Sequence, residues 1–215
     1  MRQNFEEKLE QLNQDLLKMG SMVEERIHQA ITALKEQDIE LATEVVENDD
    51  ELDDYEAEIE QKCIKMIALQ QPVAKDLRRI NMISKMATGL ERIGDLAQNI
   101  AEIAQELAGK ELIKPLVDLP RMAEIVQQML RNGLDAFVNS NVELAEKVGK
   151  RDKEVNELDD QILRELLTYM MEKPQAIKQG NKLMFVSKHL ERIGDNAKNI
   201  AEEVIYIVTG ERVHY

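Results

Sequence analysis

The sequence LERIGDLAQNIAE at residues 90–102 returns almost unchanged as LERIGDNAKNIAE at residues 190–202. The two copies differ only at their seventh and ninth positions. Self-similarity at a fixed offset indicates that the two halves of the chain are tandem copies of one structural unit. Helix packing accounts for the shared leucine, glycine and alanine residues. It does not account for the shared charged residues, because polar surface positions normally diverge after duplication. The repeat therefore predicts a duplicated fold and a function for its polar face.

Around the repeat, apolar residues recur every three or four positions through almost the whole chain. This spacing is typical of amphipathic helices that bury one stripe of side chains. Glycine, proline and capping residues interrupt the pattern and divide the chain into six predicted helices, at about residues 5–36, 38–71, 73–108, 119–139, 141–173 and 175–209.

Long helices joined by short connections pack as antiparallel bundles. We therefore predict an all-α fold of two tandem three-helix bundles, built from six long helices. Residues 1–108 are the first bundle and residues 121–215 the second. Residues 109–120, which contain Gly109, Pro115 and Pro120, are the predicted linker.

The composition excludes several classes of protein. Of the 215 residues, 43% are hydrophobic and 3% aromatic, which is enough apolar material for a core but too few large rings for a β-sandwich. Lys and Arg number 28 against 42 Asp and Glu, so the formal charge is −14. This charge argues against nucleic-acid binding, which needs Lys and Arg to displace phosphate counterions, and it permits binding of cations or of basic protein surfaces.

The cellular compartment is also indicated by the sequence. Cys63 is the single cysteine, so there is no intrachain disulfide framework and no thiolate metal cage. The first residues, MRQNFEEKLEQLNQ, are polar, and no apolar run reaches the roughly 18 residues that a membrane span requires. We expect a soluble cytoplasmic protein.

The repeat places two carboxylates on one helix face. With Leu90 as the core direction and about 100° per residue, Glu91 lies near 100° and Asp95 near 140°, so both border the core without entering it. In the second copy Glu191 and Asp195 stand in the same positions.

The helix before each repeat carries acidic residues that face it. Asp53 precedes Pro72 by as many residues as Glu91 follows it, and the same holds for Asp49 and Asp95. If Pro72 marks the turn of an antiparallel helix pair, Asp53 lies level with Glu91, and Asp49 lies level with Asp95. The first bundle is therefore predicted to carry carboxylates that converge from two helices.

The second bundle repeats this register around Pro174 to within one residue. Asn156 is matched with Glu191, and Asp152 with Asp195. Asn156 stands where the first half has Asp53, and a neutral amide is a weaker ligand than a carboxylate. A second, weaker patch is therefore predicted.

Such patches favour a cation. Two carboxylates about 6 Å apart repel by roughly 3 kcal/mol at an effective dielectric of about 20. All-oxygen sites suit hard cations such as Mg, Ca, Mn or Fe(III). The alternative is pairing with Arg92, with Arg192, with lysines or with a basic partner.

Two copies of E-x-x-x-D inside LERIGD, each in a three-helix unit, resemble the PhoU family of phosphate-uptake regulators over essentially the whole chain. The resemblance implies a pair of three-helix bundles related by a pseudo-twofold axis. It also implies multinuclear iron or zinc at the E-x-x-x-D motifs, with acidic positions on the preceding helices as further metal ligands. Carried over to this chain, the implied metal-binding positions are Glu91, Asp95, Glu191 and Asp195, with Asp49, Asp53, Asp152 and the divergent Asn156.

The resemblance further implies a role without catalysis. Proteins of this family repress phosphate uptake and phosphate-starvation signalling when phosphate is plentiful. Their partners are the phosphate-specific ABC transporter and its sensor histidine kinase, so the chain is expected at the membrane only through these partners. We also expect a homodimer.

The alternative function is a di-iron carboxylate oxidase, which needs Glu-x-x-His motifs aimed into a four-helix core. Glu25 and His28 have this spacing, as do Glu211 and His214. Helical geometry turns Glu25 and His28 towards solvent, and Glu211 and His214 follow the helix-ending Gly210. The sequence therefore favours the regulator.

Overall fold

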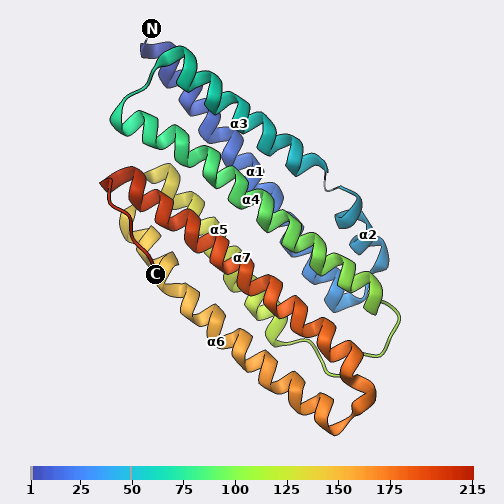
Figure 1. Ribbon diagram of the computed structural model, residues 1–215. Helices are drawn as coiled ribbons and strands as arrows, with labels where there is room; N and C mark the ends of the chain where they lie inside the picture. The colour runs from blue at the N-terminus through green and yellow to red at the C-terminus, as the bar shows by residue number, and fades with distance from the viewer. Residues whose placement is uncertain (1, 49) are drawn as a thin grey trace.

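Helices make up nearly all of the part of the chain that the computed structural model describes, residues 2–48 and 50–215 (Figure 1). The elements are α1 (Arg2–Glu36), α2 (Ile39–Glu47), α3 (Asp50–Gln70), α4 (Ala74–Leu107), α5 (Asp118–Asn139), α6 (Val142–Glu172), the 3-10 helix η1 (Pro174–Ala176) and α7 (Ile177–Thr209). The all-α prediction with six long helices is confirmed, and the short α2 is an addition to it. None of these helices combines the length and the apolar character that spanning a bilayer requires.

Local sequence signals set several helix ends. The Asp38 side chain accepts hydrogen bonds from the backbone N–H groups of Glu40 and Leu41, and so caps α2. The Asn141 side chain accepts from the Leu144 N–H in the same way at the start of α6. Gly210 ends α7 with a φ of 80°, a conformation that glycine adopts without a steric penalty.

The second predicted helix is divided in two. The sequence pattern indicated one continuous stripe from about residue 38 to 71, whereas α2 ends at Glu47 and α3 begins at Asp50. Asn and Asp are weak helix formers, and the run from Asn48 to Asp50 consists of them alone. In addition, the Arg26 guanidinium of α1 donates a hydrogen bond to the Asn48 carbonyl oxygen.

Two bundles lie against each other along their whole length (Figure 1). The first contains α1, α3 and α4, with α2 as an extension, and the second contains α5, α6 and α7. Helices α4 and α7 lie side by side and run in opposite directions, while α3 and α6 occupy the outer sides (Figure 1). The two copies of the repeat therefore lie on neighbouring, oppositely directed helices. Residues 108–117 connect the bundles, within one residue of the start of the predicted linker, and α5 begins at Asp118.

Glycine lets the outer helices approach the repeat helices. A Cβ on Gly94 would lie 2.5 Å from Leu52 Cδ1 of α3, and a Cβ on Gly194 would lie 3.2 Å from Val155 Cγ1 of α6. Leu52 and Val155 are fully buried. The two glycines therefore bring α3 onto α4 and α6 onto α7 at the level of the E-x-x-x-D motifs.

Candidate functional site

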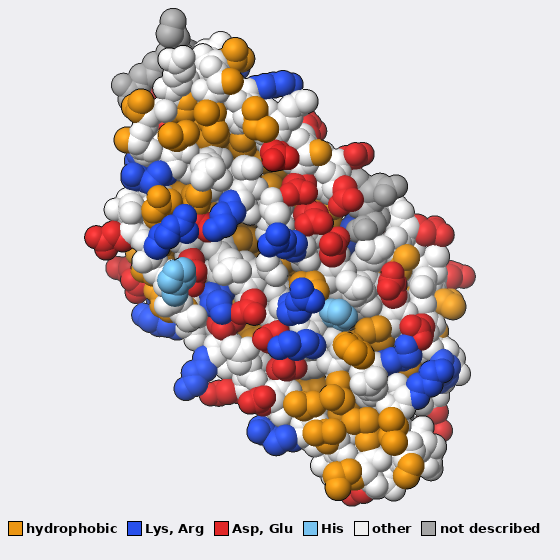
Figure 2. Space-filling view, viewed as in Figure 1, with side chains coloured by type: hydrophobic (Ala, Val, Ile, Leu, Met, Phe, Trp, Pro, Cys, Tyr) orange, Lys and Arg blue, Asp and Glu red, His pale blue; other side chains and the backbone are white. Residues whose placement is uncertain are grey.

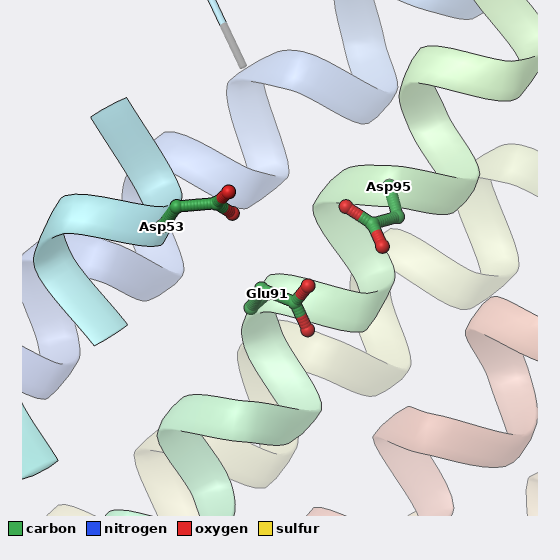
Figure 3. Close-up of side chains that lie close together, drawn as sticks. All are labelled: Asp53, Glu91 and Asp95. Atoms are coloured by element: carbon green, nitrogen blue, oxygen red, sulfur yellow. The ribbon is translucent and has the colours of Figure 1, made fainter. Parts of the chain in front are cut away.

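Three carboxylates of the first bundle converge between α3 and α4. Asp53 comes from α3, and Glu91 and Asp95 lie one turn apart on α4 (Figure 3). One oxygen from each lies within 4.8 Å of the others. Asp53 is exposed, whereas Glu91 and Asp95 are partly buried. We call these three residues the first cluster. Their convergence follows the register that the sequence predicted around Pro72.

The first cluster is electrostatically strained. Burial, followed by the charges of Asp95, Glu56 and Asp53, raises the pKa of Glu91 to about 7. Burial also raises the pKa of Asp95, although a hydrogen bond with Glu91 and, less strongly, the Arg26 guanidinium oppose this shift. Carboxylates with raised pKa values gain from a shared proton or from a bound cation, either of which reduces their repulsion.

Two neighbours of the first cluster were not among the predicted site residues. Glu56 of α3 accepts a hydrogen bond of 2.6 Å from Thr88 Oγ1 of α4, and its charge raises the pKa of Glu91. Arg26 of α1 reaches Asp95 electrostatically. Glu56 belongs to the run of acidic residues on α3, which is visible in the sequence. Arg26 lies on α1, outside any repeated or acidic pattern, so no sequence signal indicates it.

The donor set of the first cluster fits a hard cation. Oxygen ligands about 2.0 to 2.6 Å from one ion lie at most about 5 Å apart, which agrees with the spread of these three oxygens. Asp49, the fourth predicted ligand of this half, lies outside the described residues. The assignment of metal to this half stays a prediction.

The second bundle brings Asp152 of α6 and Asp195 of α7 together around a lysine. Lys198 Nζ lies 3.0 Å from Asp152 Oδ2 and 2.7 Å from Asp195 Oδ1. Burial lowers the pKa of Lys198, but its hydrogen bonds to Asp195 and Asp152 outweigh burial and raise the pKa overall. Asn156 Nδ2 donates to the same Asp152 oxygen at 3.1 Å.

Glu191 of the second bundle also faces an ammonium. Lys188 Nζ lies 2.8 Å from Glu191 Oε2, one turn earlier on α7. We call Asp152, Glu191 and Asp195 the second cluster. The predicted convergence of Asp152 with Asp195 is present, but lysine accompanies it. This is the pairing that the sequence left open as the alternative to metal, and the metal assignment of this half also stays a prediction.

The charged side chains on the surface are distributed differently over the two bundles. Figure 2 shows a group of acidic side chains on the half formed by α3 and α4. Over the middle of the molecule, acidic and basic side chains are interleaved (Figure 2).

The Glu-x-x-His pairs of the alternative reading point away from the core. Glu25 and His28 of α1 are both exposed. Glu211 and His214 follow α7 and are exposed as well, and His214 Nδ1 lies 3.3 Å from Glu202 Oε2. This placement agrees with the orientation expected from the sequence.

Comparisons with known proteins agree over nearly the whole chain. A family model described as PhoU domain matches residues 16–104 and 119–204, one copy in each bundle. A Clostridium acetobutylicum protein named phosphate-specific transport system accessory protein PhoU homolog is 42% identical over 213 residues, 99% of this chain and 97% of that protein. The Escherichia coli phosphate-specific transport system accessory protein PhoU is 38% identical over 207 residues, 96% of this chain and 86% of that protein.

Two solved structures have the same fold. PhoU from Pseudomonas aeruginosa superposes with a TM-score of 0.93 at 41% identity, covering 96% of this chain and all of that one. The phosphate transport system regulatory protein PhoU from Streptococcus pneumoniae gives a TM-score of 0.92 at 28% identity, covering 98% of this chain and all of that one.

Proposed function

Because the chain belongs to the PhoU family, we propose that it is an accessory protein of phosphate transport that restrains phosphate uptake when phosphate is plentiful. The observation that carries the proposal is the duplicated LERIGD repeat on α4 and α7, inside two matches to the PhoU domain. The names of the relatives, which describe accessory and regulatory proteins, support a role without catalysis.

We further infer the partners from the family. The chain acts in the cytoplasm on a phosphate-specific ABC transporter and on the sensor histidine kinase that reports phosphate starvation, and it works as a homodimer. The naming of relatives as parts of the phosphate-specific transport system supports the transporter.

We also propose that the first cluster binds one divalent or trivalent cation. Magnesium, manganese and calcium suit its oxygen ligands, and iron or zinc is implied by the family. Asp53, Glu91 and Asp95 would hold the ion. A cation there supplies positive charge that removes the carboxylate repulsion, and it links α3 to α4.

Uptake of phosphate by cells that lack the gene tests the regulatory role. In phosphate-rich medium we expect the deletion strain to take up radiolabelled phosphate faster than its parent, and the wild-type chain to restore the lower rate. Equal uptake rates in parent and deletion strain would contradict the proposal.

Cation stoichiometry tests the metal site. We expect Glu91→Gln with Asp95→Asn to abolish Mn²⁺ binding in the first bundle while the helical circular dichroism stays unchanged. Asp54→Asn with Glu60→Gln is the matched control, since it removes the same charge from exposed positions of α3. Unchanged manganese content in the first variant, measured by elemental analysis, would show that the site assignment is wrong.

A further inference from the structure

We propose that the two halves of this duplicated protein have different occupants at their acidic clusters. The first takes a cation from solution, and the second is neutralised by the ammonium groups of Lys198 and Lys188. For the occupancy of the first half, this inference rests on the cation site proposed above.

One of the two differences within the repeat places a lysine beside the second cluster. Lys198 stands where the first copy has Gln98. Lys198 Nζ bridges Asp152 and Asp195 at 3.0 Å and 2.7 Å, and so links α6 to α7. Gln98 carries no charge, and its amide donates instead to the Val46 carbonyl oxygen at 3.5 Å.

A second lysine follows the same pattern just outside the repeat. Lys188 pairs with Glu191 at 2.8 Å, whereas the corresponding Thr88 is neutral and donates to Glu56. Each carboxylate of the second cluster therefore has an ammonium within 3.0 Å. The positions that match these lysines in the first bundle supply no charge, and the positive group that acts on Asp95 there is the Arg26 guanidinium of α1.

The lysine at the second cluster is enclosed. The Lys198 side chain is 14% exposed and the Asp152 side chain is 9% exposed, so the pair is shielded from bulk water. A metal ion that bound Asp152 Oδ2 and Asp195 Oδ1 would have to displace the ammonium from both oxygens, and the displaced charge would remain tethered nearby. Asn156 adds to the difference between the two clusters, because its amide N–H donates a hydrogen bond to Asp152 and its side chain carries no charge.

The consequence for function is an asymmetric response. Cation concentration alters the link between α3 and α4 in the first bundle only. The link between α6 and α7 is built into the chain and does not need a bound metal ion.

Manganese titration of the full-length protein tests this division. We expect the wild-type chain to bind one Mn²⁺ tightly, as measured by electron paramagnetic resonance and equilibrium dialysis. Asp152→Asn with Asp195→Asn should leave this stoichiometry unchanged, whereas Glu91→Gln with Asp95→Asn should reduce it to none. Loss of a bound Mn²⁺ from the Asp152/Asp195 variant would overturn the proposal.

Conversion of the second cluster supplies the positive arm. Lys188→Thr, Lys198→Gln and Asn156→Asp replace three residues of the second bundle by their counterparts in the first, and we expect one additional Mn²⁺ per chain. Lys198→Arg is the control, since it keeps the positive charge and should gain none. A folded triple variant, checked by circular dichroism, that gains no Mn²⁺ would overturn the proposal.

The failure of the first-bundle site is distinguishable from the failure of this inference. If the wild-type chain binds no Mn²⁺ but the triple variant binds one, the cation site proposed for the first cluster is wrong and the lysine neutralisation of the second cluster stands.

Discussion

At the scale of single residues, the exchange of Gln98 for Lys198 between the two copies of the repeat changes what their carboxylates face. The backbone positions of Asp95 and Asp195 correspond, but only Asp195 has an ammonium at 2.7 Å. A conserved motif therefore gives two different electrostatic environments, because a long side chain one turn away reaches into one of them. Two predictions follow from these environments.

The first concerns Glu91, whose pKa is raised to about 7 from its ordinary value of 4.5. Between these pH values the folded state holds a proton that the unfolded state has released, so the metal-free protein loses stability as pH rises through this window. We expect Glu91→Gln to remove this dependence. At pH 8 it should exceed the wild-type stability by about 1 kcal/mol, after allowance for solvent around a partly exposed carboxylate.

Urea unfolding in the presence of a chelator, at about pH 5 and about pH 8, measures this dependence. Glu60→Gln, an exposed change on α3, should keep the wild-type slope. Equal pH slopes for wild type and Glu91→Gln would show that the carboxylate repulsion does not reach the folding equilibrium.

The second concerns Lys198. Its removal in Lys198→Ala leaves Asp152 enclosed without its cation, and a buried acceptor that loses its hydrogen-bond donor costs about 1 to 3 kcal/mol. Lys153→Ala is the matched control on α6, since Lys153 is exposed and its partner Glu157 is also exposed. Its effect should stay below about 0.5 kcal/mol. Similar midpoints for the two variants in thermal unfolding would contradict a structural role for the Lys198 bridge.

At the scale of helices, small residues decide how closely the outer helices approach the repeat helices. Gly94 has no room for a methyl group, because a Cβ would lie 2.5 Å from the buried Leu52 side chain. Gly89, on the same helix, is different, since the nearest atom to its Cβ would be Ile200 Cγ1 at 3.9 Å. Alanine substitutions at the two glycines therefore distinguish the cost of overpacking from the gain in helix propensity.

We expect Gly94→Ala to destabilise the protein by up to about 2 kcal/mol, because overpacking costs roughly 1 to 3 kcal/mol and the gain in helix propensity offsets about 1. The same change moves α3 away from α4, so Mn²⁺ affinity should fall. Gly89→Ala should be neutral or stabilising by up to about 1 kcal/mol with unchanged Mn²⁺ affinity. Chemical unfolding and Mn²⁺ titration of both variants measure these effects. A stable Gly94→Ala protein with normal affinity would contradict the close packing.

At the scale of the whole molecule, the parts that sequence predicts are those with local or repeated signals. Asp38 marks a helix start through capping, and Pro72 fixes the register that places Asp53 near Glu91. The break at Asn48 was not predicted, because it depends on Arg26 of another helix as well as on weak local propensity. For Asp195 the sequence left metal and lysine pairing as alternatives, since register gives the level of a residue and not the reach of a neighbouring lysine.

The bundles also meet through packing that links the two halves into one structure. Ile200 of α7 is 2% exposed. Its side chain lies next to Gly89 of α4 and Gly133 of α5. Cβ atoms on these glycines would be 3.9 Å and 3.5 Å from Ile200 side-chain carbons. One side chain thus contacts helices of both bundles where their backbones leave space.

We therefore expect Ile200→Ala to destabilise the protein by about 2 to 5 kcal/mol, since it leaves a cavity between helices that cannot readily collapse. Because the cavity opens beside α4 as well as α5, hydrogen exchange should accelerate in α1 and α4 along with α5 and α7. Met171→Ala, at a side chain that is 84% exposed, should leave exchange unchanged in both bundles. Acceleration confined to α5, α6 and α7 would instead mean that the two bundles unfold independently, and that their contact through α4 and α7 adds little to the stability of either.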